Sequence, residues 1–369
     1  MNTNTPFPCP STPLFCPNPD CRFHHRQPEP WPYQKYGYYP RQKPPYSVQR
    51  YRCRHCGRCF ADQTFKATYW LKCPEHLIEV QKHAVSGAAN RQIARILRCA
   101  PTTVDNHLAR LGRHCILLHR HFMQNVSTFS DIVVDGLVTF ERSQYHPFEI
   151  VAAVDRDTSF VIHFAEAERR RSGRMTAYQK KKRAKLEALY GKARPRAVRD
   201  AVTEVLHQAL AGASKAQLWS DEHTTYPRVV RTIDWCEVDH RTVNSKVIRT
   251  FSNPLFEVNC LDMLLRHCLK NHTRETIGFC RRRQDSIYRM AIMLVWRNYI
   301  KLRRERRCSV TPAMLLGLTD RAHLEEELVC GRLFVSHYEL PRLWDDYYWR
   351  RVRTRALAVN RVHGLRYAF

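Results

Sequence analysis

The chain has 369 residues, of which 44% are hydrophobic, and 61 lysines and arginines against 34 aspartates and glutamates give a net charge of +27. This length allows two or three domains, and the charge predicts a polyanionic partner, either nucleic acid or a membrane surface. No apolar run approaches the roughly 18 residues of a transmembrane helix, and the N-terminus does not resemble a signal peptide. Fifteen cysteines, an odd number, favour a reducing cytosol with some thiols on a metal rather than a disulfide framework.

Four N-terminal cysteines form two close pairs, Cys16 with Cys21 and Cys53 with Cys56. Each pair can present two thiolates through a short turn, and together they would complete a tetrahedral structural Zn²⁺ site. We therefore expect a zinc ribbon over residues 1–66. The Tyr- and Pro-rich segment 34–46 is longer than usual for such a site. It is either a disordered insertion or a surface that contacts nucleic acid by stacking and charge.

Residues 70–125 have the layout of a helix-turn-helix domain. An apolar helical pattern ends at Ser86-Gly87, a short helix follows over 91–97, and after a four-residue break another helix begins at Thr103. We expect the polar face of this last helix to enter a major groove of double-stranded DNA, and an ordinary helical hairpin is the alternative. The residues expected on that face are Thr103, Asp105, Asn106, His107 and Arg110.

The segment 131–139 predicts the first strand of a third domain, residues 126–306, because it is apolar and β-branched around Asp135. A carboxylate inside a buried strand needs a cation or a metal as partner, unless Asp135-Gly136 is simply a turn. Two further strands follow, at 148–154 and 159–164, as at the start of an RNase H-like α/β core with a mixed sheet and flanking helices. The basic insertion near 168–195 is either solvated or a phosphate-binding arm.

A fourth strand ends at Asp221, which could instead be a turn or a helix cap. In an RNase H-like fold the first and fourth strands are neighbours, so Asp135 and Asp221 would face each other and ligate divalent metals through oxygen. Two ions about 4 Å apart would clamp the attacking and leaving oxygens of a phosphodiester. A third acid is expected on the helix that opens near Phe256, where Asp262 could instead pair with Arg266 on the surface.

Taken together, these features resemble the DDE transposases of bacterial insertion sequences, in particular the insertion-sequence-one group and its relatives. The resemblance covers about residues 16–300, and its more specific parts are the cysteine pairs and the stretch from Leu265-Arg266 to Phe279. It implies strand cleavage at element ends that depends on Mg²⁺ or Mn²⁺, and strand transfer by the freed 3′-OH. It also implies a homo-oligomer on DNA, without membrane contact, in the bacterial cytoplasm at the nucleoid.

The same resemblance implies roles for individual residues. Asp135 and Asp221 match the first two catalytic acids, and His240 matches a histidine after the fifth strand. The group's third acid is a Glu with an Asn three residues later, whereas this chain has Asn259 and Asp262, so the pair is exchanged. One helical turn keeps the carboxylate on the same face, which makes Asp262 the expected third acid. The remaining candidates are Glu257 and Glu275 as alternative acids, and Asn259, His240 and Arg266 as supporting residues.

Because Asn259 and Asp262 are exchanged relative to the group, there are two alternatives to an active transposase. One is a DNA-binding regulator or remnant with an inactive transposase core, and the other is a structure-selective nuclease of the same fold. Residues 307–369 contain the aromatic and arginine-rich run from Trp344 to Arg355. We expect them to form a basic surface appendage, and the alternative is that they bind DNA or mediate assembly.

Overall fold

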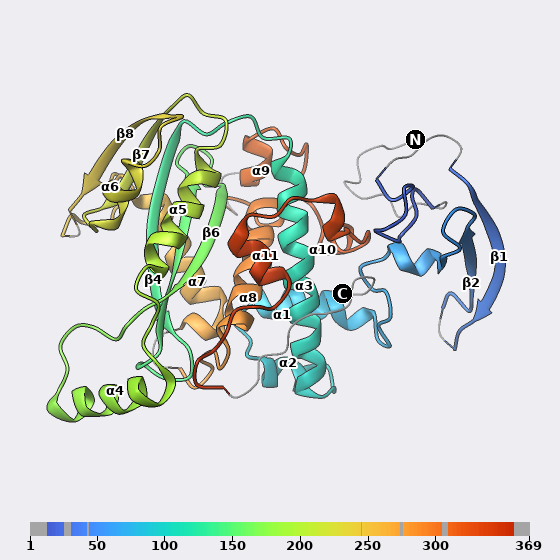
Figure 1. The fold of residues 1–369 in the computed structure, drawn as a ribbon, viewed down its shortest axis with the longest axis horizontal. Coiled ribbons are helices and arrows are strands. Elements are labelled where there is room, and N and C mark those ends of the chain that lie inside the picture. Colours follow the sequence, from blue (N-terminus) through green and yellow to red (C-terminus); the bar gives the residue numbers. More distant parts are fainter. Residues whose placement is uncertain are drawn as a thin grey trace.

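The computed structural model describes residues 13–25, 31–42, 44–244, 246–273, 276–304 and 309–357. It contains a small N-terminal sheet and a larger body in which a five-stranded sheet lies beside a layer of helices (Figure 1). None of the helices in these ranges is both long and apolar enough to cross a bilayer.

The N-terminal unit is an antiparallel sheet of β1 (Tyr33–Pro40), β2 (Ser47–Cys53) and β3 (Cys59–Ala61), followed by the 3₁₀ turn η1 (Asp62–Phe65). Its small core combines cysteines with aromatic rings, among them Trp31, Tyr51 and Phe60. Phe334, from the far end of the chain, completes this core. The segment 34–46, for which disorder was one expectation, therefore contributes strand β1.

Three helices follow: α1 (Glu75–Val85), α2 (Asn90–Ile96) and α3 (Pro101–Met123). α3 is much longer than the expected recognition helix, and its second half packs along α8 (Arg283–Val295), which continues into the π-helical turn η3 (Trp296–Ile300). The two helices approach closely at Gly112, where an added Cβ would lie 2.4 Å from the Cβ of Tyr288. The expected helix-turn-helix thus shares a hydrophobic core with the rest of the body.

The larger sheet has the strand order β6-β5-β4-β7-β8. Its strands are β4 (Asp131–Phe140), β5 (Pro147–Asp155), β6 (Val161–Glu168), β7 (Lys215–Asp221) and β8 (Glu237–Val243). β4, β5 and β6 are antiparallel neighbours, whereas β7 and β8 run parallel to β4. β4 continues unbroken through Asp135 and Gly136, so the alternative of a turn at this dipeptide is wrong.

Helices flank this mixed sheet, which confirms the mixed α/β class. α5 (Ala197–Ala209) packs against β5 and β6, and α7 (Phe256–Cys268) packs against β4 and β5. The short α6 (Thr225–Val230) follows β7 and contacts α5 and β8, and the 3₁₀ turn η2 (Lys270–His272) follows α7. β4 and β7 are the first and fourth strands of this sheet in chain order, and they are paired as expected.

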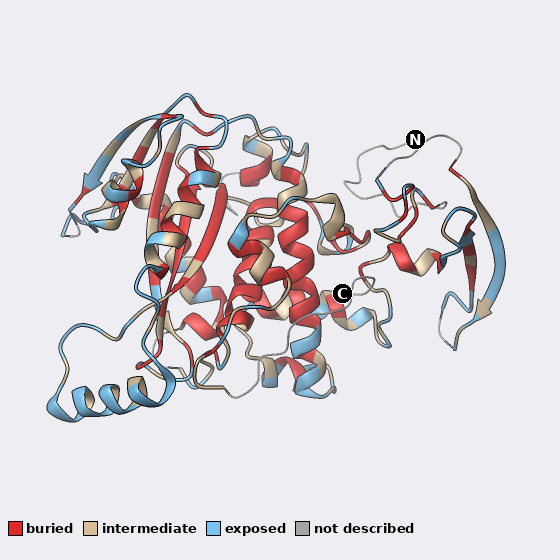
Figure 2. Ribbon diagram, in the orientation of Figure 1, coloured by how far each residue is buried: buried red, intermediate tan, exposed pale blue. Residues whose placement is uncertain are grey.

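The basic insertion forms α4 (Ala177–Tyr190), which extends away from the body (Figure 1). None of its 14 residues, all of them described, is buried, and the helix is pale blue and tan in Figure 2. It is anchored at its base by Glu187, which pairs with Arg170 at 2.7 Å and with Arg183 at 3.6 Å. A helix of this length without a buried face receives little stabilisation from packing.

The described C-terminal residues, 309–357, are not a surface appendage, and this expectation is corrected. They form α9 (Pro312–Leu315), α10 (Glu325–Leu328), the turn η4 (Val335–His337) and α11 (Arg342–Tyr348). Trp344 and Tyr347 are fully buried against β6, where the indole donates a hydrogen bond to the carbonyl of Phe164 and the Tyr347 hydroxyl accepts one from the backbone N–H of Glu166. The aromatic residues of this segment supply core, and Arg332 is buried with them, whereas Arg342, Arg351 and Arg353 are exposed.

Candidate functional site

Asp135 and Asp221 come from two strands that lie side by side. The parallel register ends with the pair Val133 and Trp219, and Asp135 and Asp221 follow two residues further along each strand, on the face of this pair. The charge of Asp221 acts on Asp135, so the two carboxylates are near each other. Asp135 accepts a hydrogen bond from the backbone N–H of Gly136 at 2.7 Å, and Asp221 accepts one from that of His223 at 3.0 Å. Asp221 is therefore the last residue of β7, and its carboxylate also stabilises the turn that follows. It is both a strand residue and, as in the alternative expectation, a turn residue.

Asp262 reaches the same region from α7. Val258, Leu261 and Leu265 form the buried face of this helix, which packs against β4 and β5. The pKa of Asp262 is raised to about 7, because burial and the charge of Asp135 raise it by more than Arg266 and Arg249 lower it. The effect of Asp135 means that the two carboxylates interact, as expected for acids of one site.

The pKa of Asp135 is raised as well, to about 6. Burial is the largest cause, the N–H of Gly136 opposes it, and the charges of Asp221 and Glu149 raise it further. Raised pKa values in neighbouring carboxylates mean that the positive charge around them does not balance their negative charge. This donor set, made of carboxylate oxygens, suits a hard divalent cation such as Mg²⁺.

Glu149 is a fourth acid at this site that the sequence reasoning missed. It lies on β5, is only 6% exposed, and forms a 2.7 Å ion pair with Arg169. Burial raises its pKa, Arg169 and His223 lower it, and the charge of Asp221 raises it. The sequence contains a signal for this residue, because Glu149 is a charged residue in an otherwise apolar strand, as Asp135 is.

These acids converge without touching. In the described part of the chain, three groups of at least three metal-ligating side chains have ligand atoms that all lie within 4.8 Å of one another. Asp135, Asp221 and Asp262 belong to none of these groups. A bound cation would therefore have to draw their oxygens closer together.

The other expected site residues are placed as follows. Glu257 points to a different neighbour, because it forms a 3.3 Å ion pair with Arg303. His240, on β8, shares a 2.9 Å hydrogen bond between its Nε2 and the hydroxyl of Ser220 on β7. Asn259 is half-buried on α7, one turn before Asp262. Glu275 lies outside the described residues.

The four N-terminal cysteines form one of the three groups of close ligands. Their thiols are free, with sulfur–sulfur distances of 3.6 Å between Cys16 and Cys56 and 3.9 Å between Cys21 and Cys53. A tetrahedron with metal–sulfur bonds of about 2.3 Å has edges of about 3.8 Å. The cluster can therefore hold a metal with little rearrangement. Burial raises the pKa of Cys21 to about 11, which a bound cation would reverse.

The expected DNA-contacting residues of α3 divide into two sets. Asn106 is exposed and Thr103 half-buried at the N-terminal end of the helix. His107 and Arg110 are buried, at 3% and 8% exposure, and Arg110 donates a hydrogen bond to the carbonyl of Ala67. The placement of these two on an outward face is corrected, because the segment before α1 covers that side of α3.

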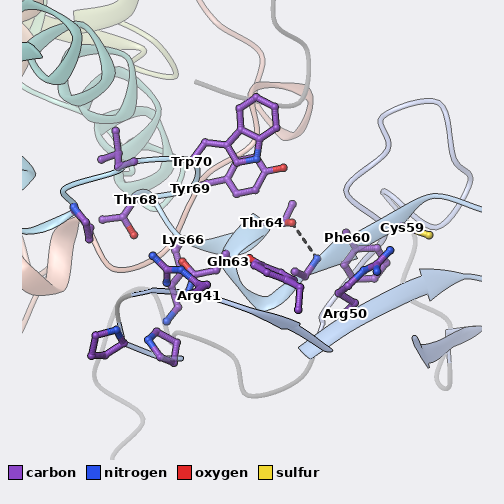
Figure 3. A pocket seen from close by; sticks show the side chains of 16 residues that line it. Arg41, Arg50, Cys59, Phe60, Gln63, Thr64, Lys66, Thr68, Tyr69 and Trp70 are labelled. Carbon is purple, nitrogen blue, oxygen red and sulfur yellow. Dashed lines mark hydrogen bonds between the residues drawn. The ribbon is translucent and has the colours of Figure 1, made fainter. Parts of the chain in front are cut away.

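A pocket of about 660 Å³ lies between the N-terminal sheet and the segment 66–74 (Figure 3). Its lining includes Tyr39, Arg41, Arg50, Lys66, Tyr69 and Trp70, and none of the described lining residues is acidic. Trp70 is 77% exposed and has a φ of 62°, in the left-handed region that bulky residues rarely adopt. Exposed aromatic rings among cations are the side chains that stack on bases and hold phosphates.

Comparisons with known proteins give one family match. Residues 78–114 match the sequence model of the luxR family of bacterial regulatory proteins, and no curated protein matches the chain. Among solved structures, a simian T-cell lymphotropic virus intasome in complex with PP2A regulatory subunit B56 gamma is 11% identical, with 64% of this chain and 73% of that chain covered and a TM-score of 0.26. The catalytic domain of Mos1 mariner transposase is 12% identical, with coverage of 50% and 86% and a TM-score of 0.19. The family match spans α2, most of α1 and the first part of α3, so the expected DNA-binding helix-turn-helix domain is confirmed.

Proposed function

We propose that the protein is a metal-dependent DNA transposase with an RNase H-like core, which binds the ends of its element and cleaves and transfers DNA strands there. The observation that supports this proposal is the parallel pairing of β4 with β7 up to Val133 and Trp219, two residues before Asp135 and Asp221, together with Asp262 on the helix that packs against β4 and β5. The strand order β6-β5-β4-β7-β8, with the first three strands antiparallel and the last two parallel to β4, is the order expected of such a core.

In this proposal Asp135, Asp221 and Asp262 are the catalytic acids. Asp262 is preferred to Glu257 because the charge of Asp135 acts on it, whereas Glu257 is paired with Arg303. Two Mg²⁺ or Mn²⁺ ions held by these acids would stabilise the attacking and leaving oxygens of a phosphodiester. Glu149 and Arg169 would adjust the charge next to Asp135, and His240 would fix Ser220 at the end of β7.

DNA would be bound by the N-terminal modules. The exposed end of α3, with Asn106, would contact base edges, and the basic, aromatic pocket beside the N-terminal sheet would contact the backbone or unstacked bases. The four cysteines would hold a structural Zn²⁺ that completes a zinc ribbon. α4, basic and without buried residues, would bind phosphates as an arm.

The test is cleavage of a labelled duplex that carries the element's end, with Mg²⁺ or Mn²⁺. Asp135→Asn, Asp221→Asn and Asp262→Asn should each abolish cleavage while they still bind the duplex. Glu257→Gln is the matched control and should keep activity. Loss of activity in Glu257→Gln together with an active Asp262→Asn would transfer the third role to Glu257.

A DNA-binding regulator with an inactive core is the second candidate. Two observations favour it: the match of residues 78–114 to a family of regulatory proteins, and the separation of the carboxylates of Asp135, Asp221 and Asp262. Tight, salt-sensitive binding of the duplex without cleavage in either metal would support this candidate and reject the transposase.

A further inference from the structure

A second group of close ligands lies at the start of α1. The ligand atoms of Cys73, Glu75 and His76 all lie within 4.8 Å of one another. Cys73 and His76 are three residues apart, the spacing at which a knuckle turn can direct two side chains to one ion. This group lies where the chain passes from the N-terminal unit into the helix-turn-helix.

His107 on α3 lies next to His76 but outside this group of close ligand atoms, so a bound ion would have to draw its ring closer. Its ring centroid is 6.3 Å from that of His76, and the side chain is only 3% exposed. The Nδ1 atoms of both His76 and His107 are buried without a hydrogen-bond partner. Buried polar atoms normally have a partner, and leaving one unsatisfied costs about 1–3 kcal/mol.

We propose that Cys73, His76 and His107 bind a second structural Zn²⁺, with Glu75 as the fourth ligand. One sulfur, two nitrogens and one oxygen form a donor set that zinc accepts in tetrahedral geometry. The ion would connect the segment 66–74 with α1 and α3, and so would fix the wall of the pocket that carries Tyr69 and Trp70 (Figure 3). This site depends neither on the transposase activity nor on the four-cysteine site.

In the third group, His24, His25 and His337, ring nitrogens of two histidines are hydrogen-bonded within the protein. The Nδ1 of His24 lies 2.7 Å from the carbonyl oxygen of Cys16, and its Nε2 shares a hydrogen bond with the hydroxyl of Ser336. Nε2 of His337 donates to the carbonyl oxygen of His24 at 3.0 Å. These nitrogens are already used within the protein, so this group provides a matched negative control.

The experiment counts zinc per chain in the untagged, full-length protein by inductively coupled plasma mass spectrometry. We expect two zinc ions in the wild type, one in Cys73→Ser, one in Cys53→Ser, and two in His337→Gln. One zinc in the wild type that is lost in Cys53→Ser and kept in Cys73→Ser would overturn the second site and leave the four-cysteine site standing. Absence of zinc from the wild type would overturn both sites.

A second measurement covers the case in which Cys73→Ser does not fold. Co²⁺ loaded into the wild type should give a spectrum with two components, one from four thiolates and one from a single thiolate with nitrogen ligands. Co²⁺ in Cys53→Ser should retain only the second component. A wild-type spectrum with the four-thiolate component alone would reject the proposal without any variant at the site.

Discussion

A Cβ on Gly136 would lie 1.9 Å from Oε1 of Glu149, so the acid of β5 occupies the space that any other residue at position 136 would fill. The glycine is there because of this close approach, since β4 itself is regular at this point. The charge of Glu149 also helps to raise the pKa of Asp135. The glycine at position 136 is thus explained by a carboxylate on the neighbouring strand.

Gly136→Ala should therefore destabilise the fold by about 1–3 kcal/mol, because the added methyl group must displace the Glu149 carboxylate. Glu149→Ala should remove the clash, so the loss in the double variant should be smaller than the sum of the two single losses. Urea unfolding of the four proteins in this double-mutant cycle measures the difference. Strictly additive losses would contradict the proposed contact.

Asp135→Asn should stabilise the metal-free protein at neutral pH. The folded-state pKa of Asp135 is raised from the ordinary 3.8 to about 6, so the folded state binds the proton more tightly than the unfolded state. The stability of the wild type should then fall as the pH rises from about 4 to about 6, and the penalty is complete above that range. A gain of about 1–3 kcal/mol at pH 7.5 is expected from the asparagine.

Melting temperatures with and without Mg²⁺ provide the control for that prediction. Mg²⁺ should raise the melting temperature of the wild type, since binding to the folded state neutralises the acids, and should do so much less in Asp135→Asn. If the asparagine variant is less stable than the wild type at pH 7.5 and more stable near pH 4, the sign of the predicted effect is wrong.

Metal-dependent cleavage should increase with pH between about 5 and 8. Asp135 and Asp262, with pKa values of about 6 and 7 in the metal-free protein, must lose their protons before they can ligate a cation. A higher Mg²⁺ concentration should shift the acidic limb of the pH–rate profile to lower pH, because metal and protons compete for the same oxygens. An acidic limb that does not move with Mg²⁺ would assign it to another group.

Sequence patterns predicted the parts of this structure that depend on local residue order. The strands around Asp135 and Asp221 and the grouping of the four cysteines follow from periodicity and spacing, whereas the adjacency of the two strands was expected from the likeness to an RNase H-like fold. His107 and Arg110 were misplaced because amphipathicity identifies a polar face but cannot show that the segment before α1 covers it. Glu149 was missed because its role depends on a neighbour across the strand pair, and the packing of Trp344 depends on a contact with β6, 180 residues away in sequence.

Asn106 and Arg110, near the N-terminal end of α3, should respond differently to mutation, because one side chain is exposed and the other is buried. Asn106→Ala should weaken binding of the element's end by about 1–3 kcal/mol and leave stability unchanged, because the side chain is exposed and available to a base edge. Arg110→Ala should instead lower the melting temperature, because its buried guanidinium holds the carbonyl of Ala67. Fluorescence anisotropy and thermal unfolding of both variants check the distinction, and the opposite pattern would restore Arg110 as a DNA contact.

α4 should contribute to DNA affinity through charge alone. Lys180, Lys181 and Lys185 are exposed on a helix without buried residues, so their replacement by alanine should not affect the fold. Each phosphate contact that is lost reduces the slope of log K against log salt by about 0.9, so the triple variant should lose up to about 3 in this slope. The triple Lys→Arg variant is the matched control and should keep both affinity and slope, because it preserves the charge. If the alanine variant binds DNA with the wild-type salt dependence, α4 is a solvated insertion, and the phosphate contacts must come from the helix-turn-helix and the N-terminal unit.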